Sequence, residues 1–187
     1  MTKANKKPGG WSEVRQQLAT WEKPALLALL KDLYEVAAEN RDFIHARSKT
    51  GEGGADVLGR NRGRIVEQFF PARGFGKLKL GEARKAIRDY RKATGNISGT
   101  AELLMTYVEN GTRFTHEYGD VDERFYDSVE SALEELAALL RAEARGMYPQ
   151  FSERLARVEQ MSGGIGWGFH DFVADVVGQL EEELGDS

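Results

Sequence analysis

The segment GGIGWGFHDF, residues 163–172, combines residue types that can bind phosphate or metal. Gly164, Gly166 and Gly168 alternate at a spacing of two and precede a helical pattern. A dinucleotide fingerprint needs its glycines between a strand and a helix, and a P-loop ends in Lys followed by Ser or Thr; both features are missing here. Two interpretations remain. The glycines form a tight connection in which the backbone passes close to a neighbour, or they form an anion site at the N-terminus of the last helix, where free N–H groups favour negative charge.

The adjacent pair His170–Asp171 in this segment also occurs in HD-type metal phosphohydrolases, which are all-α. Such a site needs further ligands, because a divalent metal requires several that converge. Only sixteen residues follow Asp171, Asp175 lies one turn on, and His116 is the available upstream histidine. The pattern therefore favours a structural role for His170, as a cap or as a hydrogen-bond partner of a buried carbonyl, and it predicts no metal site. Trp167, flanked by glycines, is expected to fill a groove or to lie beside a ligand.

A basic stripe is the clearest binding signal in the chain. Arg84, Arg88 and Arg91 fall at i, i+4 and i+7 and therefore share one face of a helix. Residues 60–92 hold eleven Lys or Arg against three Asp or Glu, whereas residues 120–187 hold sixteen Asp or Glu against five Arg. The stripe can contact the phosphates of a nucleic acid or a phosphate ligand, or it can face the acidic C-terminal third within the fold.

Composition excludes several classes of function. The chain has 187 residues, which suits one domain or at most two small ones, and it has no cysteine. The absence of cysteine excludes disulfides, zinc–cysteine sites, iron–sulfur clusters and thiol catalysis. No apolar run approaches the roughly 18 residues of a membrane span, and no apolar signal core follows the basic start MTKANKKPGG. We therefore expect a cytoplasmic protein without a membrane segment and without a cofactor.

Helical periodicity dominates the elements that must position these residues. Apolar residues recur at helical spacing along nearly the whole chain, and no segment alternates as a strand with turn residues on both sides. We predict an all-α fold, with a disordered basic arm over 1–10 and a single domain of about eight to nine helices over 11–187. The glycine-rich segment 48–56 is the best internal boundary and is expected to be a flexible loop. Paired helices with short joins suit either a multi-helix bundle or a helical-repeat-like stack.

Local signals place several helix ends. Pro24 suits the first turn of a helix, where its missing N–H costs nothing. Gly95 suits a C-terminal cap. Ser12, Ser98 and Asp120 are predicted as N-caps, and an acidic residue three positions after Asp120 gives the spacing of a capping box.

Three stretches of the sequence resemble a known family. They are ALLALLKDLYEVAAENRDFIHAR, KLGEARKAIRDYRKATGNISGTAELLMTYVENGTRFTHEYGDVDERFYDSVESAL and GIGWGFHDF, and the resemblance extends over about residues 11–180. These stretches are similar to a family of bacterial proteins without an assigned activity. The resemblance implies a helical, single-domain bacterial protein, and it supplies no catalytic residue.

Two binding functions are compatible with these patterns. The first is a non-enzymatic interaction or regulatory protein that presents helical faces to an unidentified protein partner. The second is a nucleic-acid or phosphate-ligand binder that uses the basic helix 77–92, with Arg84, Arg88 and Arg91 on one face. The absence of any complete catalytic motif favours the first.

An enzymatic function is a further alternative. Trp167, His170 and Asp171 are candidate residues for a ligand or partner, and a metal-dependent hydrolase would be built on His116, His170 and Asp171. We assign no catalytic residue from the sequence, because no nucleophile and base occur at a recognisable spacing.

Overall fold

The computed structural model describes residues 10–48 and 53–185 of the chain. Every regular element among them is a helix, nine α-helices and one 3₁₀ helix in all, which confirms the predicted all-α fold. These residues divide into an N-terminal unit that ends at Ile44 and a C-terminal unit that begins at His45. Within the described ranges, no helix is long and apolar enough to cross a membrane.

The N-terminal unit consists of α1 (Trp11–Leu18), α2 (Lys23–Val36) and most of α3 (Ala38–Ser48), which continues past Ile44. Pro24 lies in the first turn of α2, as predicted. The predicted basic arm falls almost entirely on residues 1–9, and the middle of the predicted loop 48–56 falls on residues 49–52. Both stretches lie outside the described residues.

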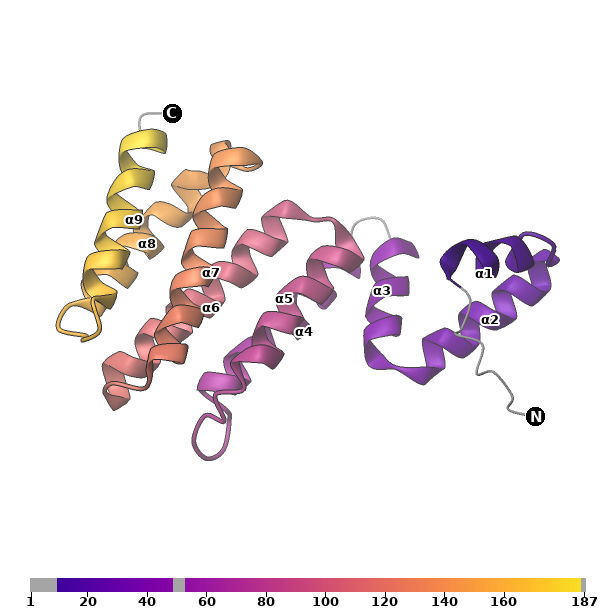
Figure 1. Ribbon diagram of the computed structural model, residues 1–187, viewed down its shortest axis with the longest axis horizontal. Coiled ribbons are helices and arrows are strands. Elements are labelled where there is room, and N and C mark those ends of the chain that lie inside the picture. The colour runs from indigo at the N-terminus through magenta and orange to yellow at the C-terminus, as the bar shows by residue number, and fades with distance from the viewer. Residues whose placement is uncertain (1–9, 49–52, 186–187) are drawn as a thin grey trace, which may run out of the picture. The chain divides into compact units, whose positions relative to one another are not determined.

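The C-terminal unit is built from three successive helical hairpins (Figure 1). Their members are α4 (Gly53–Phe69) and α5 (Leu80–Thr94), α6 (Ile97–Tyr118) and α7 (Glu123–Ala142), and α8 (Tyr148–Ser162) and α9 (Phe169–Leu184), with the 3₁₀ helix η1 (Arg145–Met147) before α8. In one layer α6 packs on both α4 and α8, and in the other α7 packs on α9. The hairpins therefore stack side by side. The sequence allowed either a bundle or a repeat-like stack, and the packing of these hairpins resembles the stack.

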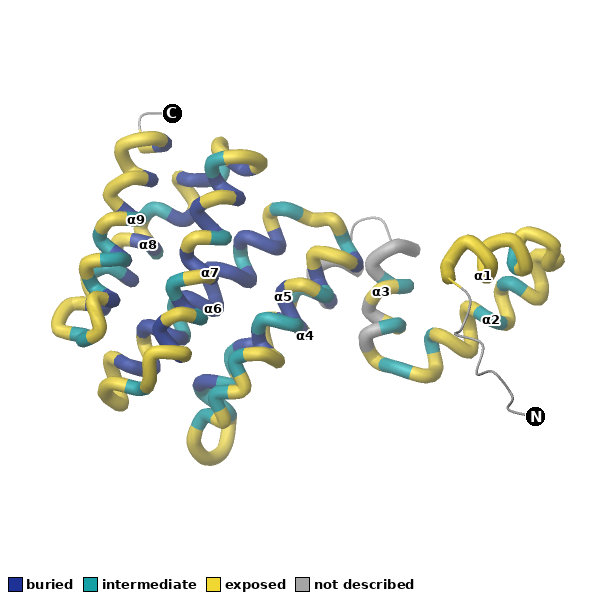
Figure 2. Tube along the Cα trace, viewed as in Figure 1, coloured by how far each residue is buried: buried dark blue, intermediate teal, exposed yellow. Residues whose placement is uncertain are grey.

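Helix α6 forms the centre of the hydrophobic core. Thirteen of its 22 residues are buried, and it contacts α4, α5, α7 and α8. Aromatic rings join it to its neighbours: the ring of Phe69 on α4 lies 5.3 Å from that of Tyr107 on α6 and 6.3 Å from that of Phe125 on α7. Figure 2 shows the buried positions gathered along the inner faces of the C-terminal unit. Edge-to-face contacts of this kind add to the free energy gained by burial.

Several helices begin or end within a few residues of the positions that the sequence predicted. Gly95 ends α5 in the left-handed conformation, with φ +63°, as predicted. The N-cap of α6 is Asn96 and not Ser98, because the Asn96 side chain accepts a hydrogen bond from Gly99 N at 2.9 Å. The N-cap of α7 is Asp122 and not Asp120. Helix α1 begins directly after Gly10, so the prediction of a cap at residue 12 was also wrong.

Two glycines on α6 permit close approach of neighbouring helices. A Cβ atom at Gly99 would overlap the phenol of Tyr90 on α5, and a Cβ atom at Gly111 would lie 2.6 Å from Cγ2 of Val129 on α7. Both glycines are buried. The packing distance between α6 and its two neighbours therefore depends on the absence of side chains at these positions.

Replacement of Gly111 by alanine should lower the free energy of unfolding by about 1–3 kcal/mol, because the added methyl group must push Val129 away. Gly178→Ala is the matched control, since Gly178 lies inside α9 with nothing within 4 Å of an added Cβ. That change should raise the free energy of unfolding by about 0.5–1 kcal/mol by removing the conformational entropy of glycine. Urea unfolding followed by circular dichroism measures both values, and a stabilising Gly111→Ala would contradict the close packing.

Candidate functional site

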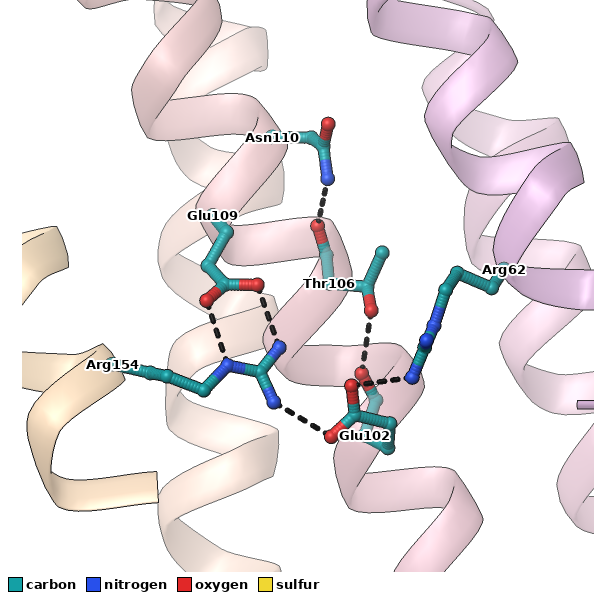
Figure 3. A network of polar contacts seen from close by, with 6 residues as sticks. All are labelled: Arg62, Glu102, Thr106, Glu109, Asn110 and Arg154. Atoms are coloured by element: carbon teal, nitrogen blue, oxygen red, sulfur yellow. Dashed lines mark hydrogen bonds and ion pairs between the residues drawn. The ribbon is translucent and has the colours of Figure 1, made fainter. Parts of the chain in front are cut away.

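A cluster of charged side chains spans the layer formed by α4, α6 and α8 (Figure 3). Arg154 on α8 donates to both oxygens of Glu109, at 2.7 Å and 2.6 Å, and to Oε2 of Glu102 at 2.7 Å. The other oxygen of Glu102 accepts a hydrogen bond from Arg62 on α4 at 2.6 Å. One guanidinium therefore joins two carboxylates, and one of these carboxylates joins two arginines.

The helical repeat of α6 places both carboxylates where Arg154 can reach them. Glu102 and Glu109 are seven residues apart, which is about two turns, so they lie on one face of the helix. The hydrogen bonds that Arg154 donates to Glu109 raise the pKa of Arg154 above its ordinary value, against the opposing effect of burial. Since each oxygen of both carboxylates accepts a hydrogen bond from an arginine, the cluster acts as a clamp that joins α4, α6 and α8.

An open cavity of about 280 Å³ lies next to this clamp. Its walls come from α6 and α8, and its lining residues are Glu109, Asn110, Arg113, Arg154, Arg157, Val158 and Met161. Of the polar groups in this lining, Asn110 donates to the Thr106 carbonyl, and Arg113 pairs with Glu117 at 2.6 Å. The polar side chains around the cavity are thus largely committed to contacts within the fold.

The arginine stripe predicted on the basic helix faces the acidic part of the chain. Arg84 lies 2.8 Å from Glu135 on α7, and Arg91 lies 3.1 Å from Glu143, which directly follows α7. Arg88, between them, is exposed and makes no ion pair within the described residues. These contacts tie α5 to α7, so a phosphate bound at the stripe must compete with two carboxylates.

The segment GGIGWGFHDF begins in the loop between α8 and α9. This loop packs on the start of α7. Gly164, Trp167 and Gly168 adopt positive φ angles of 83°, 63° and 74°. The Trp167 ring is stacked on that of Tyr126, at 6.4 Å between centroids, although Trp167 remains 62% exposed. The backbone N–H of Gly166 donates to Asp120, which also accepts a hydrogen bond from Tyr126 at 2.8 Å. The glycines therefore let the loop fold back onto a neighbouring hairpin.

His170 links the first turn of α9 to the last turn of α8. Its Nδ1 lies 2.8 Å from Oγ of Ser162, and the Ser162 hydroxyl donates to the Glu159 carbonyl. Because serine has one hydroxyl proton, and the Glu159 carbonyl accepts it, the contact with Ser162 fits an Nδ1–H of His170 that donates to Oγ. Asp171, in the first turn of α9, is exposed, where its charge complements the helix dipole.

The residues of the hydrolase alternative do not converge. His116 is exposed near the end of α6, whereas His170 and Asp171 lie at the start of α9. Over residues 10–48 and 53–185, no three His, Asp or Glu side chains are grouped as metal ligands would be. The arginine stripe lies on α5, whereas His170 lies on α9, and α7 lies between these two helices (Figure 1).

Sequence reasoning missed the clamp. The spacing of Glu102 and Glu109 is a usable signal, because it predicts two carboxylates on one helical face. No signal of this kind marks Arg154 or Arg62, since both come from other helices and their contacts depend on how the hairpins stack.

One carboxyl group of α7 is placed unfavourably for its charge. Burial raises the pKa of Glu130 above the usual 4.5, and the nearby carboxylates of Asp127 and Glu134 raise it further. No cation pairs with Glu130 within the described residues. The folded chain therefore holds this proton more tightly than the unfolded chain does.

The chain matches no protein-family model, no curated protein and no solved structure. The functional proposal below accordingly rests on the geometry of the chain itself.

Arg154→Met is expected to lower the free energy of unfolding by about 1.5–3 kcal/mol, because Glu102 and Glu109 each lose charge-assisted hydrogen bonds at half-buried positions. Arg157→Met on the same helix is the matched control. Arg157 is 60% exposed and lies 3.7 Å from Glu153, so its loss should cost less than about 1 kcal/mol. Chemical denaturation measures the free energy of unfolding of both variants. An equal decrease in the two would show that the clamp stabilises the fold no more than an exposed ion pair does.

Glu130→Gln should raise the free energy of unfolding at neutral pH, because the folded state then no longer holds a partly buried carboxylate next to two others. Because the pKa of Glu130 is higher in the folded state than in the unfolded state, the wild type loses stability as the pH rises from the unfolded pKa to the folded pKa. The gain over wild type should therefore shrink as the pH falls and disappear below about pH 4. Thermal melts across pH 3–8 test this, and a gain independent of pH would contradict it.

Proposed function

We propose that the chain is a non-enzymatic helical interaction protein, of bacterial and cytoplasmic origin, whose docking surface is the apolar face of α2. The observation that carries the proposal is the difference in burial between the two units. Neither α1 nor α2 contains a buried residue, and the buried hydrophobic residues of the described chain begin at Val57 (Figure 2). Large hydrophobic side chains instead lie exposed on both helices.

Three exposed leucines of α2 lie on one side of the helix. Leu27, Leu30 and Leu33 are between 44% and 55% exposed, and their spacing of three residues keeps them within an arc of about 120°. Val36, which is 79% exposed, extends this surface around the end of the helix. Apolar patches of this kind mark interaction surfaces in proteins that are otherwise well packed. A unit of fewer than about 50 residues also needs a partner or a larger body to stabilise it, because it cannot bury enough surface alone.

A second copy of the chain is the partner that fits this face best. The first turn of α2 contains Lys23 and follows the N-cap Glu22, whereas its last turn contains Glu35 and no basic residue, so the negative end of its dipole lacks a compensating charge. An antiparallel copy places each negative helix end beside a positive one. α1 and α2 also carry both signs of charge and no cationic excess, unlike helices that bind anionic lipid surfaces.

Symmetry increases the gain from such a contact. In an isologous dimer the same surface of both copies forms the interface, so each leucine contributes burial on both copies. Full burial of a leucine side chain contributes about 1.5–3 kcal/mol, and three such residues on each of two copies can offset the cost of association.

The oligomeric state in solution tests the proposal. Size-exclusion chromatography with light scattering should show a dimer for the wild type and a monomer for Leu30→Asn/Leu33→Asn. Asp32→Asn, at an exposed polar position of the same helix, is the control and should remain dimeric. A wild type that stays monomeric at high concentration would overturn the proposal, as would a double variant that still dimerises.

Cysteine cross-linking tests the antiparallel arrangement separately, because the chain has no cysteine of its own. Leu30→Cys lies at the centre of α2 and should form a disulfide-linked dimer upon oxidation. In an antiparallel pair the two copies of Val36→Cys lie roughly 20 Å apart, at 1.5 Å of rise per residue, which is far beyond the reach of a disulfide. Efficient cross-linking at both positions would instead indicate a parallel pair.

A further inference from the structure

A second cavity lies at the turn of the first hairpin of the C-terminal unit. It has a volume of about 410 Å³ and is lined by the end of α4, the connecting loop and the start of α5. The lining residues are Arg64, Glu67, Gln68, Pro71, Arg73, Phe75, Lys77, Lys79 and Glu82. We refer to this cavity as the hairpin pocket. It belongs to the C-terminal unit alone and is independent of the proposed docking face.

The loop that forms one wall is held in place by α4 and α6. Leu78 N donates to the Gln68 carbonyl at 3.0 Å, and Leu78 itself adopts a φ of +48°, an unusual conformation for a branched side chain. Gly76 passes so close to the end of α4 that a Cβ atom would lie 2.8 Å from the Gln68 carbonyl oxygen. The Phe75 ring contacts Tyr118 on α6 at 4.9 Å between centroids. The loop is therefore anchored at three points, and strained backbone of this kind recurs at ligand sites.

The hairpin pocket carries an excess of positive charge. Four cationic side chains and two carboxylates line it. In the described part of the chain, Arg73, Lys77 and Lys79 make no ion pair, in contrast to Arg84 and Arg91 of the stripe. Lys79 is the N-cap residue of α5, and no side chain caps that helix, so the positive end of the helix dipole is also directed here.

One buried polar atom in the wall lacks a partner. Oε1 of Gln68 is buried and accepts no hydrogen bond. A buried acceptor in this state carries the cost of a lost hydrogen bond, which a ligand hydroxyl can restore by donating to it. Glu67 and Glu82 offer two more acceptors in the same lining. Phe75, which is 60% exposed, adds an aromatic ring that is accessible to a ligand.

We propose that the hairpin pocket binds a small phosphate ester that carries hydroxyl groups, such as a sugar phosphate or a nucleotide. The phosphate lies among Arg73, Lys77 and Lys79, because these are the cations that have no carboxylate partner. A sugar hydroxyl donates to Gln68 and others to the carboxylates. The volume suits a ligand of this size. A nucleotide base, where present, stacks on Phe75, as bases do on exposed aromatic rings.

Isothermal titration with ribose 5-phosphate, AMP, adenosine and inorganic phosphate tests the proposal on the full chain. Both esters should bind saturably, and both should bind more tightly than adenosine or inorganic phosphate. Lys77→Gln/Lys79→Gln should weaken ester binding at least about tenfold, since two phosphate contacts are lost. Arg88→Gln/Lys92→Gln is the control: it removes the same charge from exposed positions of α5 that do not line the pocket, and it should leave affinity unchanged.

Two further variants separate the contributions of the wall. Gln68→Met removes the unpaired oxygen, so it should weaken binding of both esters without lowering the melting temperature of the free protein. Phe75→Leu should weaken AMP binding and leave ribose 5-phosphate binding intact if the ligand is a nucleotide, whereas equal affinities throughout would identify a sugar phosphate. The proposal is overturned by an absence of saturable ester binding, by equal loss in the control variant, or by inorganic phosphate that binds as well as the esters.

Discussion

The burial of α6 is the constraint on which the C-terminal unit depends. This helix contacts four others, and its buried positions occur on nearly all of its sides. Such a helix has no room for a side chain where neighbouring helices approach most closely, and Gly99 and Gly111 occupy two such positions. Most of its buried polar side chains form hydrogen bonds with nearby groups of the chain. The hydroxyls of Thr100 and Thr106, for example, donate to backbone carbonyls one turn earlier. The first and third hairpins are then positioned by the same central element, which fixes the order of the stack.

Charge pairing completes the stack and also determines which cations remain for function. Arginine–carboxylate contacts cross from α5 to α7, from α7 to α9 through Arg141 and Glu183, and from α4 and α8 to α6. A helix face that looks like a phosphate-binding stripe in the sequence is in this way used to join two hairpins. Arg73, Lys77 and Lys79, which make no ion pair within the described residues, lie on the loop between α4 and α5. A loop position thus leaves the charges of Lys77 and Lys79 available to a ligand, whereas a packed helix face does not.

The two units make opposite use of apolar surface. The C-terminal unit buries its aromatic and aliphatic side chains in one cluster. α1 and α2 leave theirs exposed, Trp11 and Trp21 included, although the leucine content of α2 would suit a buried core helix. An amphipathic helix whose apolar side chains stay exposed within its own unit gains stability when a partner covers them. For this reason the interaction proposal concerns α2, and the binding proposal concerns a part of the chain that is already well packed.

Local sequence determined the helices of this protein, because helical periodicity, Pro24 and Gly95 act within a few residues of where they lie. Local signals also excluded a nucleotide fingerprint in the glycine segment before α9, since no strand precedes its glycines. Only the tertiary structure decided what each face meets. The partners of Arg84 and Arg154 come from helices about fifty positions away, and the hairpin pocket exists because Gly76 and Leu78 fold the loop back onto α4. Contacts of this range depend on how the hairpins stack, and periodicity along a single helix carries no information about that.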